Sequence, residues 1–502
     1  MAGEYLLGID VGSSSIKVAL IDAESGLVVG IAHSPERELE IQVPKVGWAE
    51  QDPEIWWQHV CLAVGTLRQQ VGARLLEQTI GIGVAYQMHG LVTIDKDDLP
   101  VRPAIIWCDG RAVQVGADAY RSLGTARCLK QLANSPGNFT VSKLAWLKSH
   151  EPNAYARVAS FMLPGDYIAL RLTGERTTTP LGLSEAMVWD VEANAPAQFV
   201  YDHFGISAAL QPQLVPALSV QGHLGASAAA ALGIPIGVPL GYRAGDQPNN
   251  AFALRVLDPG QVAAAAGTSG VLFAVDEHPV IDPLQRVNAF LHVPHGSSAE
   301  RQNRYGTLLC LNGTGILYAW IRKLYSTSGL MEYSALNALA AAAPVGAEGL
   351  VVLPFGNGAE RVLENQDLGA SFHGVRCALH GPEHLARAAL EGIACSFRFG
   401  LEVMAEQIVR PTAIRAANGN LFLSPLFRDL VASICETTVE LFDTSGAVGA
   451  ARAAGVGIGY YRSLEESFVG LAPLSTTEPK RDLIEQLAPV FDRWSGRLAC
   501  AS

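Results

Sequence analysis

The 502-residue sequence is poor in charged residues, and its net charge is acidic. Only 17% of the residues are charged and 49% are hydrophobic, so the chain is expected to fold almost throughout, with little disorder. The formal net charge of −12 argues against nucleic acid as a partner, because binding a phosphate backbone needs a basic face. A single nucleotide remains compatible, since local dipoles and one metal ion can hold it.

Several common nucleotide, hydrolase and metal motifs are also missing. There is no Gly-Lys pair, which excludes a P-loop. Neither Gly-x-Gly-x-x-Gly nor Gly-x-Ser-x-Gly occurs, so a dinucleotide fold and a serine-hydrolase elbow have no support. The string 380–384 (HGPEH) resembles a zinc-protease motif. The Gly-Pro pair between its histidines prevents them from sharing one helix face, so we interpret the match as chance.

The cysteine pattern and the N-terminus predict a soluble, cytoplasmic protein. The eight cysteines include no Cys-x-x-Cys pair, and no basic segment followed by an apolar run opens the chain. We therefore expect reduced, mostly buried thiols. One uncharged run, 224–242, contains two prolines and four glycines, which favours a helix entering a loop over a membrane span. No membrane partner is expected.

The first 90 residues have the element order of a ribonuclease-H-like lobe. Apolar runs at 5–10, 16–22 and 27–32 are separated by Gly/Ser turns, which predicts an antiparallel meander. Pro53 opens a helical pattern that continues to about residue 71, and 79–85 is a buried strand.

A second strand–turn–strand pattern follows far downstream. The run 261–266 leads into 267–270 (GTSG) and then 271–275, which repeats the arrangement of the N-terminus. The predicted fold class is therefore α/β, with two ribonuclease-H-like (actin-like ATPase) lobes. The turn at 258–260 lies near the boundary, so we expect lobes at residues 1–251 and 252–502.

The second lobe is expected to be rich in helices. Helical patterns are found at 331–343 and 383–408. The Ala/Gly-rich run that follows 443–446 and ends at Gly459 predicts a loop entering a tightly packed helix.

Four polar clusters follow apolar strands and can carry chemistry. They are 10–17 (DVGSSSIK), 86–90 (YQMHG), 241–250 (GYRAGDQPNN) and 267–270. The two Gly/Ser/Thr turns expose N–H groups and hydroxyls that can hold phosphate oxygens. The carboxylate of Asp246 can accept a proton from a hydroxyl.

Each cluster also has a purely structural explanation. Asp10 and Lys17 also fit an ordinary hairpin, Asp246 an ordinary turn, and His89 a histidine satisfied in the core or a loop. Phosphoryl transfer is the reaction that needs all four together, because it requires positioning, neutralisation of spreading charge and a base for the attacking hydroxyl.

These clusters and several other segments resemble the FGGY carbohydrate kinases, and within them the xylulokinases. The resemblance covers most of the chain, in the order of the family. The matching segments are 10–17, 48–57 (WAEQDPEIWW), 87–90 (QMHG), 103–111 (PAIIWCDGR), 140–147 (TVSKLAWL), 163–167 (LPGDY), 245–246 and 267–269.

The resemblance implies a nucleotide and sugar cleft between the two lobes, ATP and Mg²⁺ as cofactors, and a role for each matching residue. It makes Asp246 the general base and Asp10 a ligand of Mg²⁺. The residues implied to contact the sugar are Met88, His89, Trp107, Asp246 and Gln247. Those implied to contact ATP are Ser13, Ser14, Lys17, Gly267, Thr268, Gly313, Gly419 and Asn420. Only the resemblance to the family suggests that the protein forms a homodimer.

Two departures from the family pattern bear on substrate and nucleotide. Asp246 is followed by Gln-Pro, where xylulokinases commonly have Asn-Ala, and 417–420 (ANGN) keeps one glycine of the adenosine motif. The leading hypothesis is conversion of D-xylulose and ATP to D-xylulose 5-phosphate and ADP. The alternatives are an FGGY kinase for another ketose or polyol (ribulose, glycerol-like or sedoheptulose-like) and an actin-like ATPase or sugar sensor without sugar kinase activity.

Overall fold

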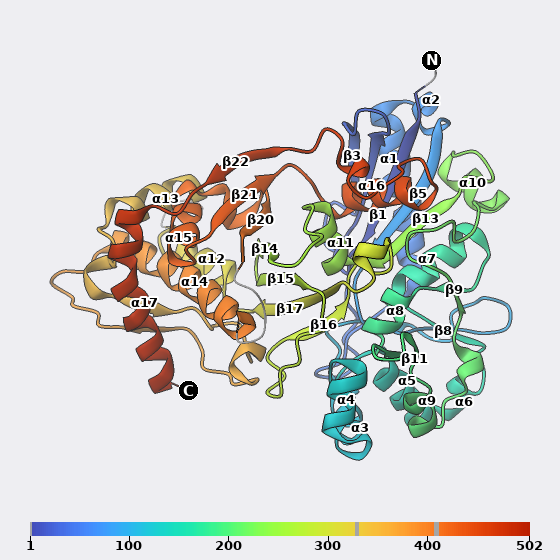
Figure 1. Ribbon diagram of the computed structural model, residues 1–502, viewed down its shortest axis with the longest axis horizontal. Helices are drawn as coiled ribbons and strands as arrows, with labels where there is room; N and C mark the ends of the chain where they lie inside the picture. Colours follow the sequence, from blue (N-terminus) through green and yellow to red (C-terminus); the bar gives the residue numbers. More distant parts are fainter. Residues whose placement is uncertain (1–2, 327–330, 406–410, 502) are drawn as a thin grey trace. The chain divides into compact units, whose positions relative to one another are not determined.

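The computed structural model describes residues 3–326, 331–405 and 411–501 and has two compact units. Unit 1 comprises Met1–Arg255, Phe290–Tyr305 and Thr444–Leu471, and unit 2 comprises Val256–Ala289, Gly306–Asp443 and Ala472–Ser502. Each contains its own mixed sheet with helices, so the predicted two-domain α/β fold is confirmed (Figure 1). The expected lobe division between residues 251 and 252 remains a prediction.

Unit 1 contains a five-stranded sheet in the order β13-β5-β1-β2-β3. The strands β1 (Tyr5–Val11), β2 (Ile16–Asp22) and β3 (Val28–Ser34) form the predicted antiparallel meander. Next to them, β5 (Thr79–Tyr86) and β13 (Leu240–Gly245) run parallel to β1. Because parallel neighbours end on the same edge, the C-terminal ends of β1, β5 and β13 lie together.

Helices cover both faces of this sheet. On one face, α1 (Pro53–Val71) packs on β2 and β3, and α7 (Pro164–Thr173) packs on β5 and β13. The α1 helix begins where predicted because Asp52 caps it and proline occupies its first position. The opposite face is covered by α16 (Gly446–Gly457), which contacts β1, β5 and β13 (Figure 1).

The α16 helix lies unusually close to the sheet because glycines face it. A Cβ at Gly8 would overlap the carbonyl oxygen of Ala447, and a Cβ at Gly83 would overlap that of Ala450. The predicted tightly packed helix is therefore confirmed, although it packs in unit 1 whereas the sequence pattern was assigned to the second lobe. Small residues signal close packing but do not specify which sheet receives the helix.

Smaller elements complete unit 1. They are β4 (Glu50–Gln51), α2 (Ala73–Leu76), β6 (Val92–Ile94), β7 (Ala104–Ile105), α3 (Val113–Leu123), α4 (Thr125–Leu132), α5 (Thr140–His150), α6 (Pro152–Tyr155), β8 (Ser160–Met162), β9 (Thr177–Thr178), α8 (Pro180–Glu185), β10 (Trp189–Asp190), β11 (Ala195–Pro196), α9 (Gln198–Phe204), β12 (Gln213–Leu214), α10 (Ala226–Leu232) and α11 (Asp246–Ala253).

The seven-stranded sheet has the order β16-β17-β15-β14-β20-β21-β22. Its strands are β14 (Gln261–Ala266), β15 (Gly270–Asp276), β16 (Asn288–Leu291), β17 (Tyr305–Leu311), β20 (Ala413–Ala417), β21 (Thr438–Phe442) and β22 (Pro473–Thr477). The β14–β15 hairpin is antiparallel, and β14, β20 and β21 are parallel, which repeats the plan of unit 1.

Among the described residues, five α-helices and a two-stranded ladder accompany this sheet. They are α12 (Gly315–Leu324), α13 (Tyr333–Ala342), α14 (Pro382–Ala405), α15 (Pro425–Ile434), α17 (Arg481–Ala501), β18 (Val351–Leu353) and β19 (Ser371–His373). The helical patterns at 331–343 and 383–408 correspond to α13 and α14, and residues 406–408 lie outside the described residues.

The cysteines follow the expectation from the sequence only partly. The eight cysteines, all of which lie in the described residues, form no disulfide bonds. The expectation that most are buried is wrong, because only Cys128 and Cys395 are buried while Cys108, Cys377 and Cys500 are exposed.

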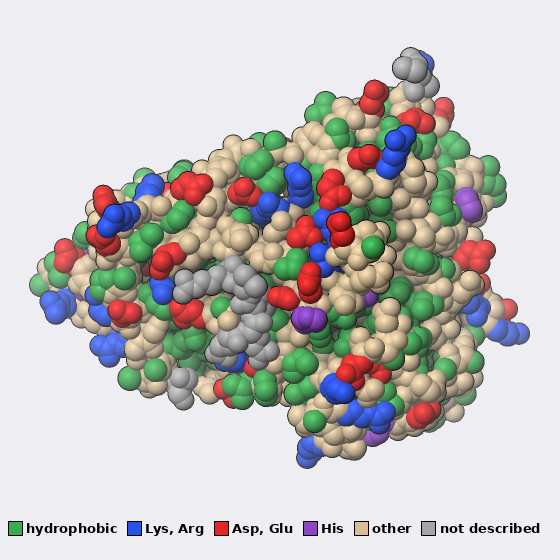
Figure 2. All heavy atoms as spheres, viewed as in Figure 1, with side chains coloured by type: hydrophobic (Ala, Val, Ile, Leu, Met, Phe, Trp, Pro, Cys, Tyr) green, Lys and Arg blue, Asp and Glu red, His purple; other side chains and the backbone are tan. Residues whose placement is uncertain are grey.

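Acidic and basic side chains are interspersed on the face shown in Figure 2. Within the described ranges, every helix is too short or too polar to cross a bilayer.

The contact between Gly83 and α16 generates a stability prediction. We expect Gly83→Ala to destabilise the protein by about 1–3 kcal/mol, because its methyl group would overlap the carbonyl oxygen of Ala450. Gly65→Ala is the matched control, since Gly65 lies in α1 with open space beside it and alanine favours helix. Thermal unfolding should show a lower Tm for Gly83→Ala only, and equal Tm values would contradict the close packing.

Candidate active site

Asp246 is held at the junction of a buried strand and a helix. Gly245 ends β13, and Asp246 is the first residue of α11, where helix N–H groups favour a negative charge. Gly245 has no side chain, which leaves room for two neighbours: a Cβ there would lie 2.5 Å from Met88 Cγ and 3.1 Å from Glu185 Oε1. The end of β13 therefore packs directly against the segment that contains Met88.

The pKa of Asp246 is raised to about 7. Burial is the main cause, and the neighbouring carboxylate of Asp10 adds to it. Hydrogen bonds from the backbone and side chain of Gln247 partly offset both effects. A carboxyl group that titrates near neutral pH is suited to accept a proton from a hydroxyl.

Asp10 is the penultimate residue of β1 and faces the start of α16. A Cβ at Gly446 would overlap Asp10 Oδ2 and would lie 3.0 Å from Asn250 Oδ1. Burial raises the pKa of Asp10, and the charge of Lys17, its partner across the hairpin, partly offsets this. Two side-chain oxygens therefore converge beside the glycine that opens a helix.

These oxygens suit a hydrated Mg²⁺, which takes one or two carboxylates from a protein and the rest of its ligands from water and phosphates. The described residues contain no group of three or more acidic, histidine or cysteine side chains arranged to hold a metal ion. The donor set therefore fits an ion that arrives with a phosphate ligand.

The turn after β1 is compact and partly exposed. Its closing bond runs from Gly12 N to Ser15 O at 3.1 Å, and Ser14 is exposed at its tip. The Trp107 indole Nε1 donates to Ser13 Oγ at 3.3 Å, and 53% of Trp107 remains exposed. Trp107, assigned to the sugar by resemblance, thus also contacts the turn at residues 12–15, which is the predicted first phosphate hairpin.

The Met88–His89 loop is fixed by three hydrogen bonds. His89 has a φ of +61°, an uncommon conformation for a non-glycine residue. Its backbone N–H donates to Glu185 Oε2 at 3.0 Å, and its carbonyl oxygen accepts from Lys143 Nζ at 2.8 Å. His89 Nδ1 lies 3.1 Å from the carbonyl oxygen of Glu185, so Nδ1 is the donor there.

Glu185 and Lys143 had no role in the sequence prediction. Both are buried: burial raises the pKa of Glu185 well above its usual value and lowers the pKa of Lys143 to about 7. Lys143 lies in the segment 140–147 that matches the family, so the sequence held a signal that could have singled it out. Glu185 lies in none of the matching segments, and only the fold brings it to His89.

Unit 2 brings a second set of predicted residues together. Thr314 Oγ1 donates to the carbonyl oxygens of Gly267 and Thr268, both at 3.3 Å. A Cβ at Gly267 would lie 3.5 Å from Asn420 Nδ2. The β14–β15 turn, the start of α12 and the loop after β20 therefore meet.

Two residues in the loops beside this turn are constrained by the backbone, one by lack of space for a side chain and one by a positive φ. Gly313 cannot carry a side chain, because a Cβ there would overlap the carbonyl oxygen of Pro354. Asn420 adopts a φ of +54°, next to the extended Gly419. Glu360, which sequence reasoning missed, is buried and accepts hydrogen bonds from the N–H groups of Asn312 and Gly313 at 2.8 and 2.9 Å.

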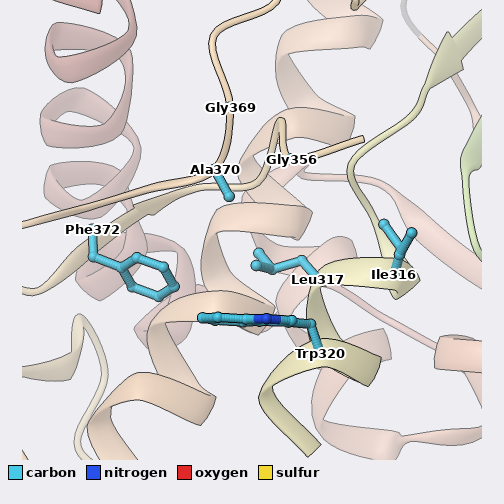
Figure 3. Close-up of a pocket in the computed structure, with 7 residues that line it drawn as sticks. All are labelled: Ile316, Leu317, Trp320, Gly356, Gly369, Ala370 and Phe372. Atoms are coloured by element: carbon cyan, nitrogen blue, oxygen red, sulfur yellow. The ribbon is translucent and has the colours of Figure 1, made fainter. Parts of the chain in front are cut away.

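A pocket of about 350 Å³ opens beside α12 (Figure 3). It is lined by Ile316, Leu317, Trp320, Gly356, Gly369, Ala370 and Phe372. The rings of Trp320 and Phe372 have centroids 6.1 Å apart, and 46% of Trp320 is exposed. The pocket adjoins the second hairpin, since Ile316 N donates to the Thr268 carbonyl oxygen at 3.1 Å.

The predicted residues thus fall into two groups. Unit 1 holds Asp10, Ser13, Ser14, Lys17, Met88, His89, Trp107, Asp246 and Gln247, and unit 2 holds Gly267, Thr268, Gly313, Gly419 and Asn420. The roles assigned to these residues remain proposals.

Known proteins match both units. The N-terminal and C-terminal domain models of the FGGY family of carbohydrate kinases match residues 5–253 and 262–458. The chain is 32% identical to a xylulose kinase of Klebsiella pneumoniae over 456 residues, 90% of either chain. It is 30% identical to a xylulose kinase of Escherichia coli (strain K12), over 92% of this chain and 91% of the relative.

Solved structures agree with this. The crystal structure of a xylulose kinase from Rhodospirillum rubrum has a TM-score of 0.88 to this chain at 26% identity, covering 99% of both chains. A structure from Brucella ovis described as that of a "xyloylose kinase" gives the same TM-score, identity and coverage. The chain belongs to the FGGY family of carbohydrate kinases.

Proposed function

We propose that the protein transfers the terminal phosphoryl group of ATP to D-xylulose, giving D-xylulose 5-phosphate and ADP. The observation that carries the proposal is the carboxyl group of Asp246, which titrates near neutral pH at the end of a strand that packs against Met88. The similarity to proteins named xylulose kinase supports D-xylulose as the acceptor. We further propose that the reaction takes place in the cytoplasm.

In the proposed reaction, the oxygen of the sugar 5-hydroxyl attacks the terminal phosphorus of ATP, and Asp246 accepts the proton of that hydroxyl. The bond from that phosphorus to the bridging oxygen breaks, and ADP leaves. Met88 and His89 orient the sugar, and Glu185 and Lys143 hold His89 in its left-handed conformation. A loop held in one conformation places the acceptor without a large entropic cost at the moment of reaction.

Asp10, with Asn250 beside it, would hold Mg²⁺ together with the phosphate oxygens of ATP. The ion would supply neutralisation of the charge that spreads over the transferring phosphoryl group. In unit 1, the hydroxyls of Ser13 and Ser14 would bind phosphate oxygens. In unit 2, the turn at Gly267 and Thr268 would offer a second set of phosphate-binding groups.

We propose that the pocket beside α12 receives the adenine ring. Trp320 offers a flat, half-exposed aromatic surface, and Phe372 and Leu317 close the apolar wall (Figure 3). The same helix contacts the second phosphate hairpin at its first turn, so a base in the pocket lies along the helix from that hairpin. Gly419 and Asn420 remain the predicted contacts of the adenosine.

The proposal is tested by ADP release from the purified protein with ATP, Mg²⁺ and a panel of acceptors. Gln247, next to the base, contacts the sugar by resemblance and differs from the common Asn, so the panel includes D-ribulose, sedoheptulose, glycerol and gluconate. D-Xylulose is expected to give the highest kcat/KM. A higher kcat/KM for another acceptor would identify that acceptor as the substrate. ATP hydrolysis that needs no acceptor would favour an ATPase. Binding of sugar without turnover would favour a sensor.

The role of Asp246 predicts a severe loss of activity on mutation. Asp246→Asn is expected to lower kcat by about a hundredfold or more, because the amide cannot accept the proton. The same change removes a carboxyl whose folded pKa lies above its unfolded value, and such a group destabilises the fold increasingly as pH rises towards about 7. The Tm at neutral pH should therefore be equal or higher. Near-normal turnover would contradict the role.

The pH dependence has a defined sign. The base acts only when it is ionised, so kcat/KM for D-xylulose should rise as pH increases through the pKa of Asp246, about 7, and then level off. The measurement is a rate profile from about pH 5.5 to about pH 9 at saturating ATP. A rate that is constant across neutral pH, or that falls, would contradict proton transfer to Asp246.

The adenine pocket predicts a nucleotide-specific effect. Trp320→Ala should raise the KM for ATP by about tenfold or more, since stacking of a base on an aromatic ring is worth about 1–3 kcal/mol. The KM for D-xylulose should stay unchanged, and Trp320→Phe should have a smaller effect because it keeps an aromatic face. Equal KM values for ATP in all three proteins would exclude the pocket as the site of the base.

A further inference from the structure

The segment 48–57 (WAEQDPEIWW) matches the family but has no part in the mechanism described above. Much of it anchors unit 1. Glu50 pairs with Arg111, Asp52 caps α1, and Glu54 bonds to Tyr167. Gln51 is different, because this residue is only 3% exposed and its side chain reaches both predicted ligand-binding segments of the unit.

The Gln51 amide has a hydrogen-bond partner on each side. Its Nε2 donates to the carbonyl oxygen of Ser13 at 2.7 Å and to that of Glu40 at 3.3 Å. Its Oε1 accepts from Trp56 Nε1 at 3.0 Å and from Gln87 Nε2 at 3.4 Å. Four partners surround one buried amide.

The partners also fix the orientation of this amide. A carbonyl oxygen only accepts and an indole N–H only donates, so Nε2 must face Ser13 and Oε1 must face Trp56. A carboxylate of the same length would place an oxygen against the carbonyl oxygen of Ser13, and the two would repel. A carboxamide therefore satisfies these positions and a glutamate does not.

Gln51 thus contacts both the first phosphate hairpin and the sugar-binding loop. Ser13 lies in the hairpin, where its hydroxyl also accepts from Trp107. Gln87 directly precedes Met88 and His89, and its backbone N–H donates to the carbonyl oxygen of Val11 at 2.8 Å. The two segments are held together by this backbone bond and by the side chain of Gln51.

We propose that Gln51 is a positioning residue that holds the phosphate hairpin and the sugar-binding loop in one arrangement, so that bound sugar strengthens nucleotide binding. The inference rests on the proposed function. Coupling between two sites is reciprocal, so bound nucleotide strengthens sugar binding by the same factor. If Gln51 were only a satisfied core amide, its replacement would change stability and leave this coupling intact.

The test compares Gln51→Glu with Gln69→Glu in the full chain. Gln69 lies exposed on α1, so its variant adds the same charge away from both segments. Isothermal titration gives the Kd of ADP with and without saturating D-xylulose, the Kd of D-xylulose alone, and thus the coupling factor. Steady-state rates give kcat/KM for ATP, and thermal unfolding reports the fold.

In the wild type, D-xylulose should tighten ADP binding about fivefold or more. Gln51→Glu should reduce this factor to within about twofold of unity and lower kcat/KM for ATP about tenfold, while the Kd of D-xylulose alone changes less than about threefold. Gln69→Glu should match the wild type. Retention of the wild-type coupling by Gln51→Glu, or its absence from the wild type, would overturn the inference.

Two further results complete the design. If Gln51→Glu does not fold, Trp56→Phe provides the test, because it removes the indole donor that orients the amide and keeps an aromatic ring at this buried position. It should weaken the coupling about twofold or more, and unchanged coupling would overturn the inference. A wild-type protein that binds and phosphorylates no sugar contradicts the proposed function itself, whereas a wild type that phosphorylates sugar without coupling contradicts only the role of Gln51.

Discussion

The close contact of α16 with the sheet of unit 1 is the constraint on which the candidate site depends. Gly8 and Gly83 let the helix backbone approach β1 and β5 directly, and Gly446 lets the helix begin against the carboxylate of Asp10. With a side chain at any of these positions, the helix would have to move away from the sheet. The pairing of parallel strands then brings the ends of β1 and β13, and with them Asp10 and Asp246, to one edge.

This arrangement places two carboxyl groups where ionisation of either one is unfavourable. Burial raises the pKa of both, and the charge of Asp10 raises that of Asp246 further. The fold tolerates the cost because the surrounding packing fixes both strands. A cation and a hydroxyl substrate would each use one of these groups, which is why the unfavourable pairing makes chemical sense in a phosphoryl-transfer site.

Much of the fold was predictable because its signals are local. The alternation at 5–10 and 16–22, the proline that opens α1 and the GTSG turn all correspond to the elements observed. The positions of Asp10 and Asp246 near strand ends were predictable because these polar residues follow apolar runs. Glu185, Lys143, Gln51 and Glu360 gained no role from the sequence because they act on backbone groups distant in the chain. Such contacts depend on the tertiary structure and leave no periodic pattern.

The central claim is that a sugar hydroxyl binds beside Asp246. The measurement that tests it most directly is a crystal structure of the protein with D-xylulose. The 5-hydroxyl oxygen should lie about 3 Å from a carboxylate oxygen of Asp246, with the rest of the sugar against Met88 and His89. A sugar bound elsewhere, or bound here with its 5-hydroxyl turned away from Asp246, would contradict the account.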